Sequence, residues 1–350
     1  MLHRSTRIWI CWFCTIFFAS LILTGCSLPA IAWQEETPDP AILGMMAQVQ
    51  TTTLIDRVNQ LTGVTPAQIG GESYTITTRE TESGVPIAKA TQFVYEFLET
   101  RGLAVSYHNW SECDMGNRNV VGEITGVDRP DEIVVVTAHL DSIATAGLAA
   151  GADDDASGSV AVLTIAEILA PYQFQRTLRF VLFTGEEQGL CGSDVYARQA
   201  AAANLNIVAV FNMDMIAWDS DAEPFVRLHT RQSNHTGYAA DLAIANTFIN
   251  VVEAYGLSGA LTPIVAPDAS DMSDTYSFWD NGYPAILAIE DDDDNAGDFN
   301  PYYHTSADRV SEFNTTYYTN FVKAAVGTTA LLAGVVQTPK ARLYLPAVGR

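Results

Sequence analysis

The chain has 350 residues, of which 48% are hydrophobic and 17% are charged, so it can bury a large core. This composition excludes a disordered or collagen-like chain. The 41 acidic residues outnumber the 18 basic ones and give a net charge of −23, with no basic patch. Nucleic acid is therefore not an expected partner.

The N-terminus has the layout of a secretory signal. Basic residues among the first seven positions precede an apolar run from Ile8 to Leu23, which is shorter than the roughly 20 residues of a membrane-spanning helix. The run ends in Leu23-Thr24-Gly25-Cys26, which resembles a bacterial lipobox whose cysteine is lipid-modified. The alternatives are an ordinary signal peptide that contains a cysteine and an uncleaved anchor.

The lipobox interpretation predicts a signal peptide over residues 1–25, a membrane-proximal linker over 26–42 and an exported protein. Acyl chains on Cys26 would anchor this protein to a bacterial membrane without spanning it. Cys113 and Cys191 then remain, either as a disulfide, which export would allow, or as two free thiols.

Beyond the linker, hydrophobic periodicity predicts alternating helices and strands. In chain order these are a helix over 45–61, a strand over 74–79, a helix over 87–100, strands over 119–126 and 132–139, a helix over 157–169, a strand over 178–184, a helix over 190–203, a strand over 207–213, a helix over 238–255, a strand over 285–290 and a helix over 316–336.

This alternation indicates an α/β fold, a three-layer sandwich around a mixed, mostly parallel central sheet. No linker interrupts residues 43–338, so one catalytic domain is expected there, followed by a C-terminal tail over 339–350.

Metal-competent residues follow four of the predicted strands. His139 and Asp141 end one strand, Glu186 and Glu187 follow the next, Asp214 follows a third, and His304 lies in the loop after the last. Ligands of open α/β sheets bind at these carboxyl ends. Imidazole and carboxylate together suit zinc, and the number of ligands exceeds what one tetrahedral ion uses.

Two metal ions with a bridging carboxylate and water would account for this ligand number. They would activate the water and polarise a carbonyl, while a carboxylate outside the metal shell moves the proton. Adjacent glutamates on an extended segment point in opposite directions, so one of Glu186 and Glu187 can bind metal while the other stays free. Signatures of serine hydrolases, of other zinc peptidases and of phosphate-binding loops are absent.

At these residues the chain resembles the co-catalytic zinc exopeptidases, the family of bacterial secreted leucyl aminopeptidases, with glutamate carboxypeptidase II and glutaminyl cyclase as more distant relatives. The motifs that carry the resemblance occur in the order of the family. They are His139-Leu140-Asp141-Ser142, Gly151-Ala152-Asp153-Asp154-Asp155-Ala156-Ser157-Gly158, Gly185-Glu186-Glu187-Gln188-Gly189, Asn212-Met213-Asp214-Met215 and Tyr303-His304-Thr305.

The resemblance implies two zinc ions. It implies Asp153 as the bridging ligand, with a cis peptide bond between Asp153 and Asp154. Glu187 and His304 would complete one ion. The remaining implied residues are His139 and Asp214 on the second ion, Glu186 as general base and Asp141 as the acid that orients His139.

The chain departs from the family pattern at Ser273-Asp274-Thr275, where threonine replaces a histidine and no tyrosine precedes. Stabilisation of the oxyanion would fall to the metal alone or to a tyrosine among Tyr276, Tyr302 and Tyr303.

The expected substrates are peptides with a free N-terminus. The oligomeric state is left open, with a monomer expected. The alternatives are a glutaminyl-cyclase-like acyltransferase, which would use one zinc, a carboxypeptidase of the same fold, and a non-catalytic binding lipoprotein.

Two further groups of residues carry weaker expectations. The acidic run at 290–294 is interpreted as a solvated loop, with a calcium site as the minor alternative; it could also rim the site and favour basic substrates. His108, His229 and His235 have no acidic partner at motif spacing, so we expect them to be surface or core histidines.

Overall fold

A computed structural model describes residues 38–293 and 297–337, which belong to one compact unit. The predicted signal peptide, Cys26 and the tail over 339–350 lie outside the described residues. Within the described part of the chain, no helix has the length and apolar character needed to cross a membrane.

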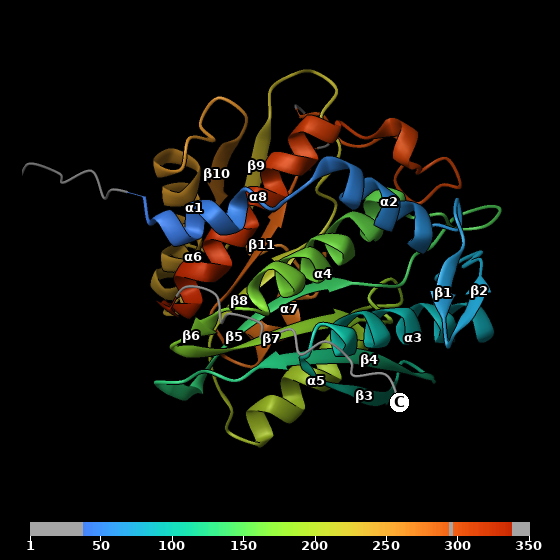
Figure 1. Cartoon of the computed structure of the whole chain (residues 1–350), viewed down its shortest axis with the longest axis horizontal. Coiled ribbons are helices and arrows are strands. Elements are labelled where there is room, and N and C mark those ends of the chain that lie inside the picture. Colours follow the sequence, from blue (N-terminus) through green and yellow to red (C-terminus); the bar gives the residue numbers. More distant parts are fainter. Residues whose placement is uncertain (1–37, 294–296, 338–350) are drawn as a thin grey trace, which may run out of the picture. The chain divides into compact units, whose positions relative to one another are not determined.

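The centre of this unit is an eight-stranded sheet in the order β10-β9-β11-β8-β5-β7-β4-β3 (Figure 1). Its strands are β3 (Ala104–Glu112), β4 (Met115–Ile124), β5 (Arg129–His139), β7 (Arg176–Phe183), β8 (Asn206–Met213), β9 (Phe225–His229), β10 (Thr262–Ala266) and β11 (Ala285–Ile289). β5 runs parallel to both β7 and β8, and β8 is parallel to β11. Antiparallel pairs join β3, β4 and β7 at one end and β9 and β11 at the other, so the sheet is mixed, as predicted.

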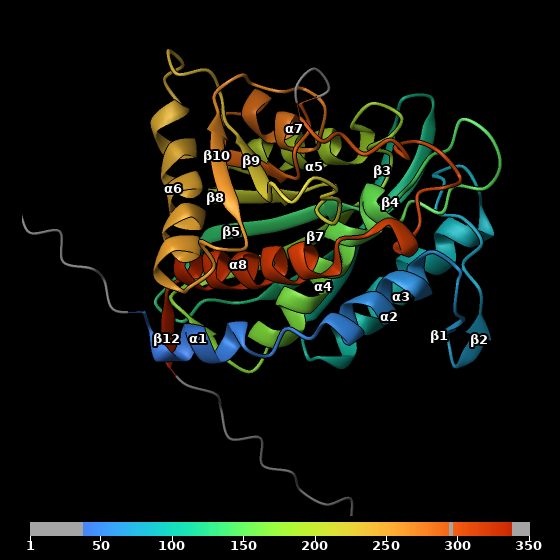
Figure 2. The ribbon, with the colours of Figure 1, turned by 90° about the horizontal axis from the view of Figure 1, so that it is seen from above.

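Helices cover both faces of this sheet (Figure 2). The helices are α1 (Pro40–Met46), α2 (Thr51–Leu61), α3 (Val85–Thr100), α4 (Gly158–Leu169), α5 (Cys191–Ala202), α6 (Tyr238–Ala254), α7 (Thr275–Asp280) and α8 (Thr315–Ala333). α5 and α7 pack on one face, and α4 and α8 lie on the other beside α1, α2, α3 and α6. The three-layer sandwich is therefore confirmed.

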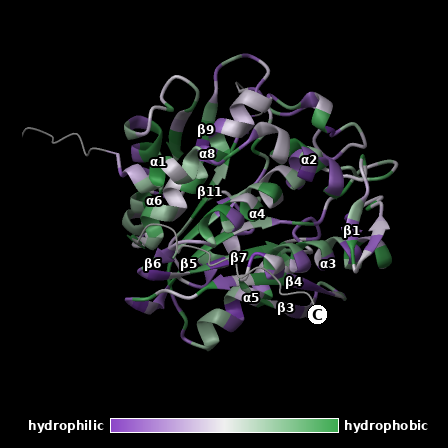
Figure 3. Cartoon of the chain, in the orientation of Figure 1, coloured by the Kyte–Doolittle hydropathy of each residue, from purple (hydrophilic) through white to green (hydrophobic). Residues whose placement is uncertain are grey.

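Burial follows this layering. α4 is buried along nearly its whole length, and Figure 3 colours the central strands mainly as hydrophobic. β5 shows why: its run Ile133-Val134-Val135-Val136 is buried on both faces of the sheet, with one core on each side. Short two-stranded sheets, β1 (Ala67–Ile69) with β2 (Glu72–Tyr74) and β6 (Gln173–Phe174) with β12 (Val335–Gln337), flank the unit.

Three local predictions are wrong. The predicted helix over 45–61 is two helices, because a tight turn at 47–50 separates α1 from α2, and α1 itself begins inside the predicted linker. The predicted strand over 74–79 ends at Tyr74, because Arg79 turns into the interior and donates its hydrogen bonds to backbone carbonyls of other segments.

Candidate active site

The carboxyl ends of three adjacent parallel strands meet at one edge of the sheet. β5 ends at His139, the segment after β7 carries Glu186 and Glu187, and Asp214 directly follows β8. His304 reaches the same place from the loop between β11 and α8. The strand order therefore brings together side chains that are up to 165 residues apart, as the sequence predicted.

Two groups of metal-competent atoms share one carboxylate, that of Asp154. One group is His139, Asp154 and Asp214, and the other is Asp154, Glu187 and His304. Oδ1 of Asp154 lies 3.0 Å from Nε2 of His139, and its Oδ2 lies 3.2 Å from Nε2 of His304. Nε2 of His139 is 3.4 Å from Oδ1 of Asp214, and Nε2 of His304 is 2.9 Å from Oε2 of Glu187. Each oxygen of Asp154 thus faces a different group.

The structure places Asp154 rather than Asp153 where the two groups meet, so Asp154 replaces Asp153 as the proposed shared ligand. Both oxygens of Asp153 are already engaged: Oδ1 accepts from the backbone N–H of Ala217 at 2.9 Å and Oδ2 from the side-chain amide of Asn300 at 2.7 Å. The cis peptide bond lies between Asp154 and Asp155 rather than between Asp153 and Asp154. Both features therefore lie one residue later in the run Asp153-Asp154-Asp155 than the resemblance implied.

The flanking residues show why the run is held in this register. Asp308 accepts hydrogen bonds from the backbone N–H groups of both Asp153 and Asp154. Asp155 accepts from the backbone N–H of Gly158 at 2.8 Å, at the start of α4. A Cβ at Gly158 would lie 2.5 Å from Asp155 Oδ1, so glycine is required there. The middle aspartate alone is left to face the two histidines.

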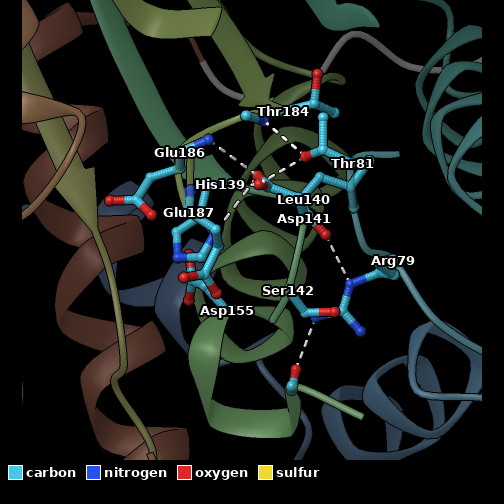
Figure 4. A network of polar contacts seen from close by, with 12 residues as sticks. Arg79, Thr81, His139, Leu140, Asp141, Ser142, Asp155, Thr184, Glu186 and Glu187 are labelled. Carbon is cyan, nitrogen blue, oxygen red and sulfur yellow. Dashed lines mark hydrogen bonds and ion pairs between the residues drawn. The ribbon is translucent and has the colours of Figure 1, made fainter. Parts of the chain in front are cut away.

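The segment that carries the two glutamates is anchored by Asp141 and Thr81 (Figure 4). Asp141 accepts from the backbone N–H groups of Glu186 at 3.4 Å and Glu187 at 3.3 Å. Thr81 donates to Asp141 at 2.9 Å and accepts from the backbone N–H of Gly185 at 3.1 Å.

The other end of this segment is fixed by a disulfide. Cys191, the first residue of α5, is bonded to Cys113 in the turn between β3 and β4. The structure therefore decides for the disulfide between the two alternatives that the sequence left open.

The predicted role of Asp141 in orienting His139 remains a prediction. Oδ1 of Asp141 lies 3.7 Å from Nδ1 of His139, beyond hydrogen-bond distance, and both side chains are fully buried. The contacts of Asp141 that the structure does show hold the glutamate segment.

The electrostatics of the site favour cations. Burial alone would raise the pKa of Asp154, but hydrogen bonds from His139 and His304 outweigh it and hold the pKa below its usual range. Burial alone would lower the pKa of His304, but Asp154 and Glu187 raise it to about 10. Burial, followed by the charge of Asp154, raises the pKa of Glu187 to about 7. The carboxylates of Asp154 and Glu187 therefore stabilise positive charge at the site.

The two groups of donor atoms that share Asp154 fit two zinc ions. Each group offers one imidazole, a terminal carboxylate and a share of Asp154, a combination that suits zinc. Oε1 of Glu187 is buried without a hydrogen-bond partner, as expected of an atom that a bound cation would satisfy.

The sequence did not single out a polar chain that holds Asp214. Ser273 donates to Oδ2 of Asp214 at 2.7 Å and accepts from the side-chain amide of Asn212 at 2.8 Å. Asp308 behind Asp154 was also missed. Ser273 lies in the stretch where the chain departs from the family pattern, but only the folded chain shows its partner, 59 residues away.

A cavity of about 400 Å³ opens onto this site. Its polar lining includes six of the residues described above and two more from neighbouring loops: His139, Asp154, Glu186, Glu187, Asp214, His304, Ser270 and Asp292. Its apolar lining consists of Met215, Met272, Leu287, Ile289, Phe299 and Tyr303. Of the three tyrosines considered for oxyanion stabilisation, Tyr303 lines the cavity and stacks on His304, with ring centroids 3.7 Å apart.

The acidic run after β11 is not a solvated loop over its described part, residues 290–293. Glu290 and Asp291 are buried, and Glu290 accepts from the backbone N–H groups of Ala217 and Trp218. Asp291 pairs with Arg227 at 2.7 Å. Asp292 lines the cavity, so the run does reach the rim of the site.

The sequence is similar to those of known peptidases. Residues 119–329 match the model of Peptidase family M28. The chain is 30% identical over 194 residues to a probable leucine aminopeptidase 2 of Aspergillus oryzae, covering 52% of this chain and 36% of that protein. It is 28% identical over 203 residues to aminopeptidase YwaD of Bacillus subtilis, covering 57% and 41%. The matches thus span less than half the length of these two relatives.

Solved structures agree at the level of the fold. The Legionella pneumophila aminopeptidase LapA superposes with a TM-score of 0.66 at 19% identity, covering 85% of this chain and 75% of that one. The glutaminyl cyclase of Macrostomum lignano superposes with a TM-score of 0.69 at 17% identity, covering 87% and 96%. Since the family model spans more than half of the residues, the chain belongs to peptidase family M28.

Proposed function

We propose that this protein is a zinc aminopeptidase that uses two metal ions to remove N-terminal residues from peptides. The observation that carries the proposal is the pair of donor groups that share Asp154. His139 and Asp214 would complete one ion, and Glu187 and His304 the other. When bound, the two ions would lower the pKa of a shared water and polarise the scissile carbonyl.

Glu186 is the proposed general base. It lines the cavity beside the two donor groups but belongs to neither of them. Burial, together with the nearby charges of Asp214, Asp274 and Glu187, raises its pKa against the lowering effect of His139. A carboxylate with a raised pKa is suited to accept the proton of the attacking water and to donate it to the leaving amine.

The charge of the cavity supports a free-amine substrate. Carboxylates line it, and among the described residues that line it none is lysine or arginine. A carboxypeptidase would need a cationic group for the substrate's carboxylate. Two donor groups rather than one also favour a hydrolase over a one-zinc acyltransferase, and the presence of every expected ligand type argues against a non-catalytic binding protein.

The test is hydrolysis of a leucyl-peptide by the zinc-loaded full chain, compared with the same peptide N-acetylated. We expect cleavage of the free-amine peptide alone. Cleavage of both would contradict recognition of the amine, and cleavage of neither by protein with two bound zinc ions would contradict the proposed activity. Glu186→Gln should retain both zinc ions and lose about 10²–10⁴-fold in kcat, the usual contribution of a general base.

We further propose that Cys26 is lipidated and anchors the exported protein to a bacterial membrane. The support is the sequence alone, a basic segment and a short apolar run ending in Leu23-Thr24-Gly25-Cys26. Metabolic labelling with a fatty-acid analogue should mark the wild type and leave Cys26→Ser unlabelled. Equal labelling of the two would contradict the anchor.

A further inference from the structure

A second ionic cluster lies behind the wall of the cavity. His229, the last residue of β9, is buried, and its two ring nitrogens face carboxylates from two different loops. Nδ1 lies 2.9 Å from Oδ1 of Asp268 in the loop after β10. Nε2 lies 3.1 Å from Oδ2 of Asp292 in the loop after β11. His229 is therefore a core histidine, one of the two expected alternatives, and its acidic partners lie 39 and 63 residues away rather than at motif spacing.

Both loops form part of the cavity wall. Asp292 lines the cavity itself, and Ser270 and Met272 line it from the loop that Asp268 begins. Asp268 also accepts from the backbone N–H of Ser270 at 3.2 Å, which fixes the start of that loop. His229 itself is not among the lining residues, so its connection to the cavity runs through these two loops.

We infer that His229 is a positioning residue that joins the two loops and so sets the size of the pocket for the substrate's first side chain. The inference rests on the proposed function. The apolar part of the pocket lining includes Met272, Leu287 and Phe299. It therefore suits a large apolar first residue such as leucine, and the carboxylate of Asp292 is occupied by His229 rather than left for a basic substrate.

The charges around His229 favour its protonated form, which can pair with carboxylates of both loops. Burial alone would lower the pKa of His229, but the hydrogen bond with Asp268 and the adjacent carboxylate of Asp292 raise it to about 9. Arg227, on the same strand, contacts the acidic residues of the second loop, Asp291, Asp292 and Asp293. The imidazolium is therefore present below about pH 9, and its pairing is lost as the pH rises through that value.

Because Arg227 holds the second loop independently, loss of His229 should release mainly the loop of Asp268. The pocket would then lose part of its contact with a large side chain, while the metal ligands stay in place. Such a change removes binding energy that the bound substrate and the transition state share equally, which raises KM and leaves kcat unchanged.

The experiment compares His229→Gln with His235→Gln, a matched change at an exposed histidine. For His229→Gln we expect KM for leucyl-p-nitroanilide to rise about tenfold, as for the loss of one or two well-packed methylenes. KM for the alanyl substrate and both kcat values should stay within about twofold. His235→Gln should match the wild type. Equal changes for the two substrates, or none, would overturn the inference.

Two further measurements keep the test independent of folding and of the proposed activity. The variant Asp268→Asn changes a half-exposed residue and leaves the contact between His229 and Asp292 in place. It should show the same selective rise in KM. In the wild type, NMR should find the His229 ring protonated at pH 7, and a neutral ring would refute the pairing. If the zinc-loaded wild type cleaves neither substrate, the proposed function fails. Calorimetry then still decides the inference: the wild type should bind leucine more tightly than alanine, and His229→Gln should weaken this preference.

Discussion

Replacement of Arg79 by methionine should strongly destabilise the fold around the site. Arg79 is fully buried and donates to four backbone carbonyls, those of Leu140 at 2.7 Å, Leu61 at 3.1 Å, Ala150 at 2.9 Å and Gly151 at 2.7 Å. These bonds tie the end of α2 to the segments before and after the loop that separates His139 from Asp154. Figure 4 shows Arg79 beside Leu140.

The size of the effect follows from the number of bonds. Methionine has a similar length but no donors, so each carbonyl loses a hydrogen bond worth about 1 kcal/mol, or about 4 kcal/mol in all. An unfolding entropy of about 2.1 cal/mol/K per residue over about 300 residues makes this a fall in Tm of about 6 °C. Burial lowers the pKa of Arg79, while the charges of Asp308 and Asp155 raise it, so a positive charge near the acidic ligands is lost as well.

The assay is thermal unfolding of the zinc-free protein, with Arg309→Met as the matched control. Arg309 is exposed and donates to one carbonyl, that of Ser306, so its loss should change Tm by less than about 1 °C. Arg79→Lys should fall between Arg79→Met and the wild type, since an ammonium offers three donors. A Tm of Arg79→Met within 1 °C of the control would refute the reasoning.

Three other predictions concern the site. Asp154→Asn should abolish binding of both zinc ions, whereas Asp153→Asn should still bind two, as measured by calorimetry; the reverse would restore Asp153 as the shared ligand. Replacing Cys113 and Cys191 together by serine should lower the free energy of unfolding by about 2–4 kcal/mol in denaturant titrations, and no change would show that the disulfide does not contribute. Tyr303→Phe should lower kcat about 10²–10³-fold if its hydroxyl donates to the oxyanion, and an unchanged kcat would leave that role to the metal ions.

The sequence predicted the sheet and the meeting of the ligands because both depend on local patterns. Continuous apolar runs such as Ile133 to Val136 mark strands that are buried on both faces. Polar residues placed directly after such strands must then converge at one edge. His139, Glu187, Asp214 and His304 could be brought together on this basis alone.

The choice among the three aspartates could not be made in the same way. Adjacent residues of identical chemistry differ only in their backbone direction, which depends on Asp308, Asn300 and other residues far along the chain. The strand containing His229 was missed for a similar reason. β9 is only five residues long, and the acidic partners of His229 lie in separate loops that the fold alone brings together.

The most direct test of the proposed metal centre is a crystal structure of the zinc-loaded protein with diffraction data collected on both sides of the zinc absorption edge. The account predicts two anomalous peaks, one on each side of the Asp154 carboxylate, the first bound by His139 and Asp214 and the second by Glu187 and His304. A single peak, or two peaks bridged by another residue, would contradict it.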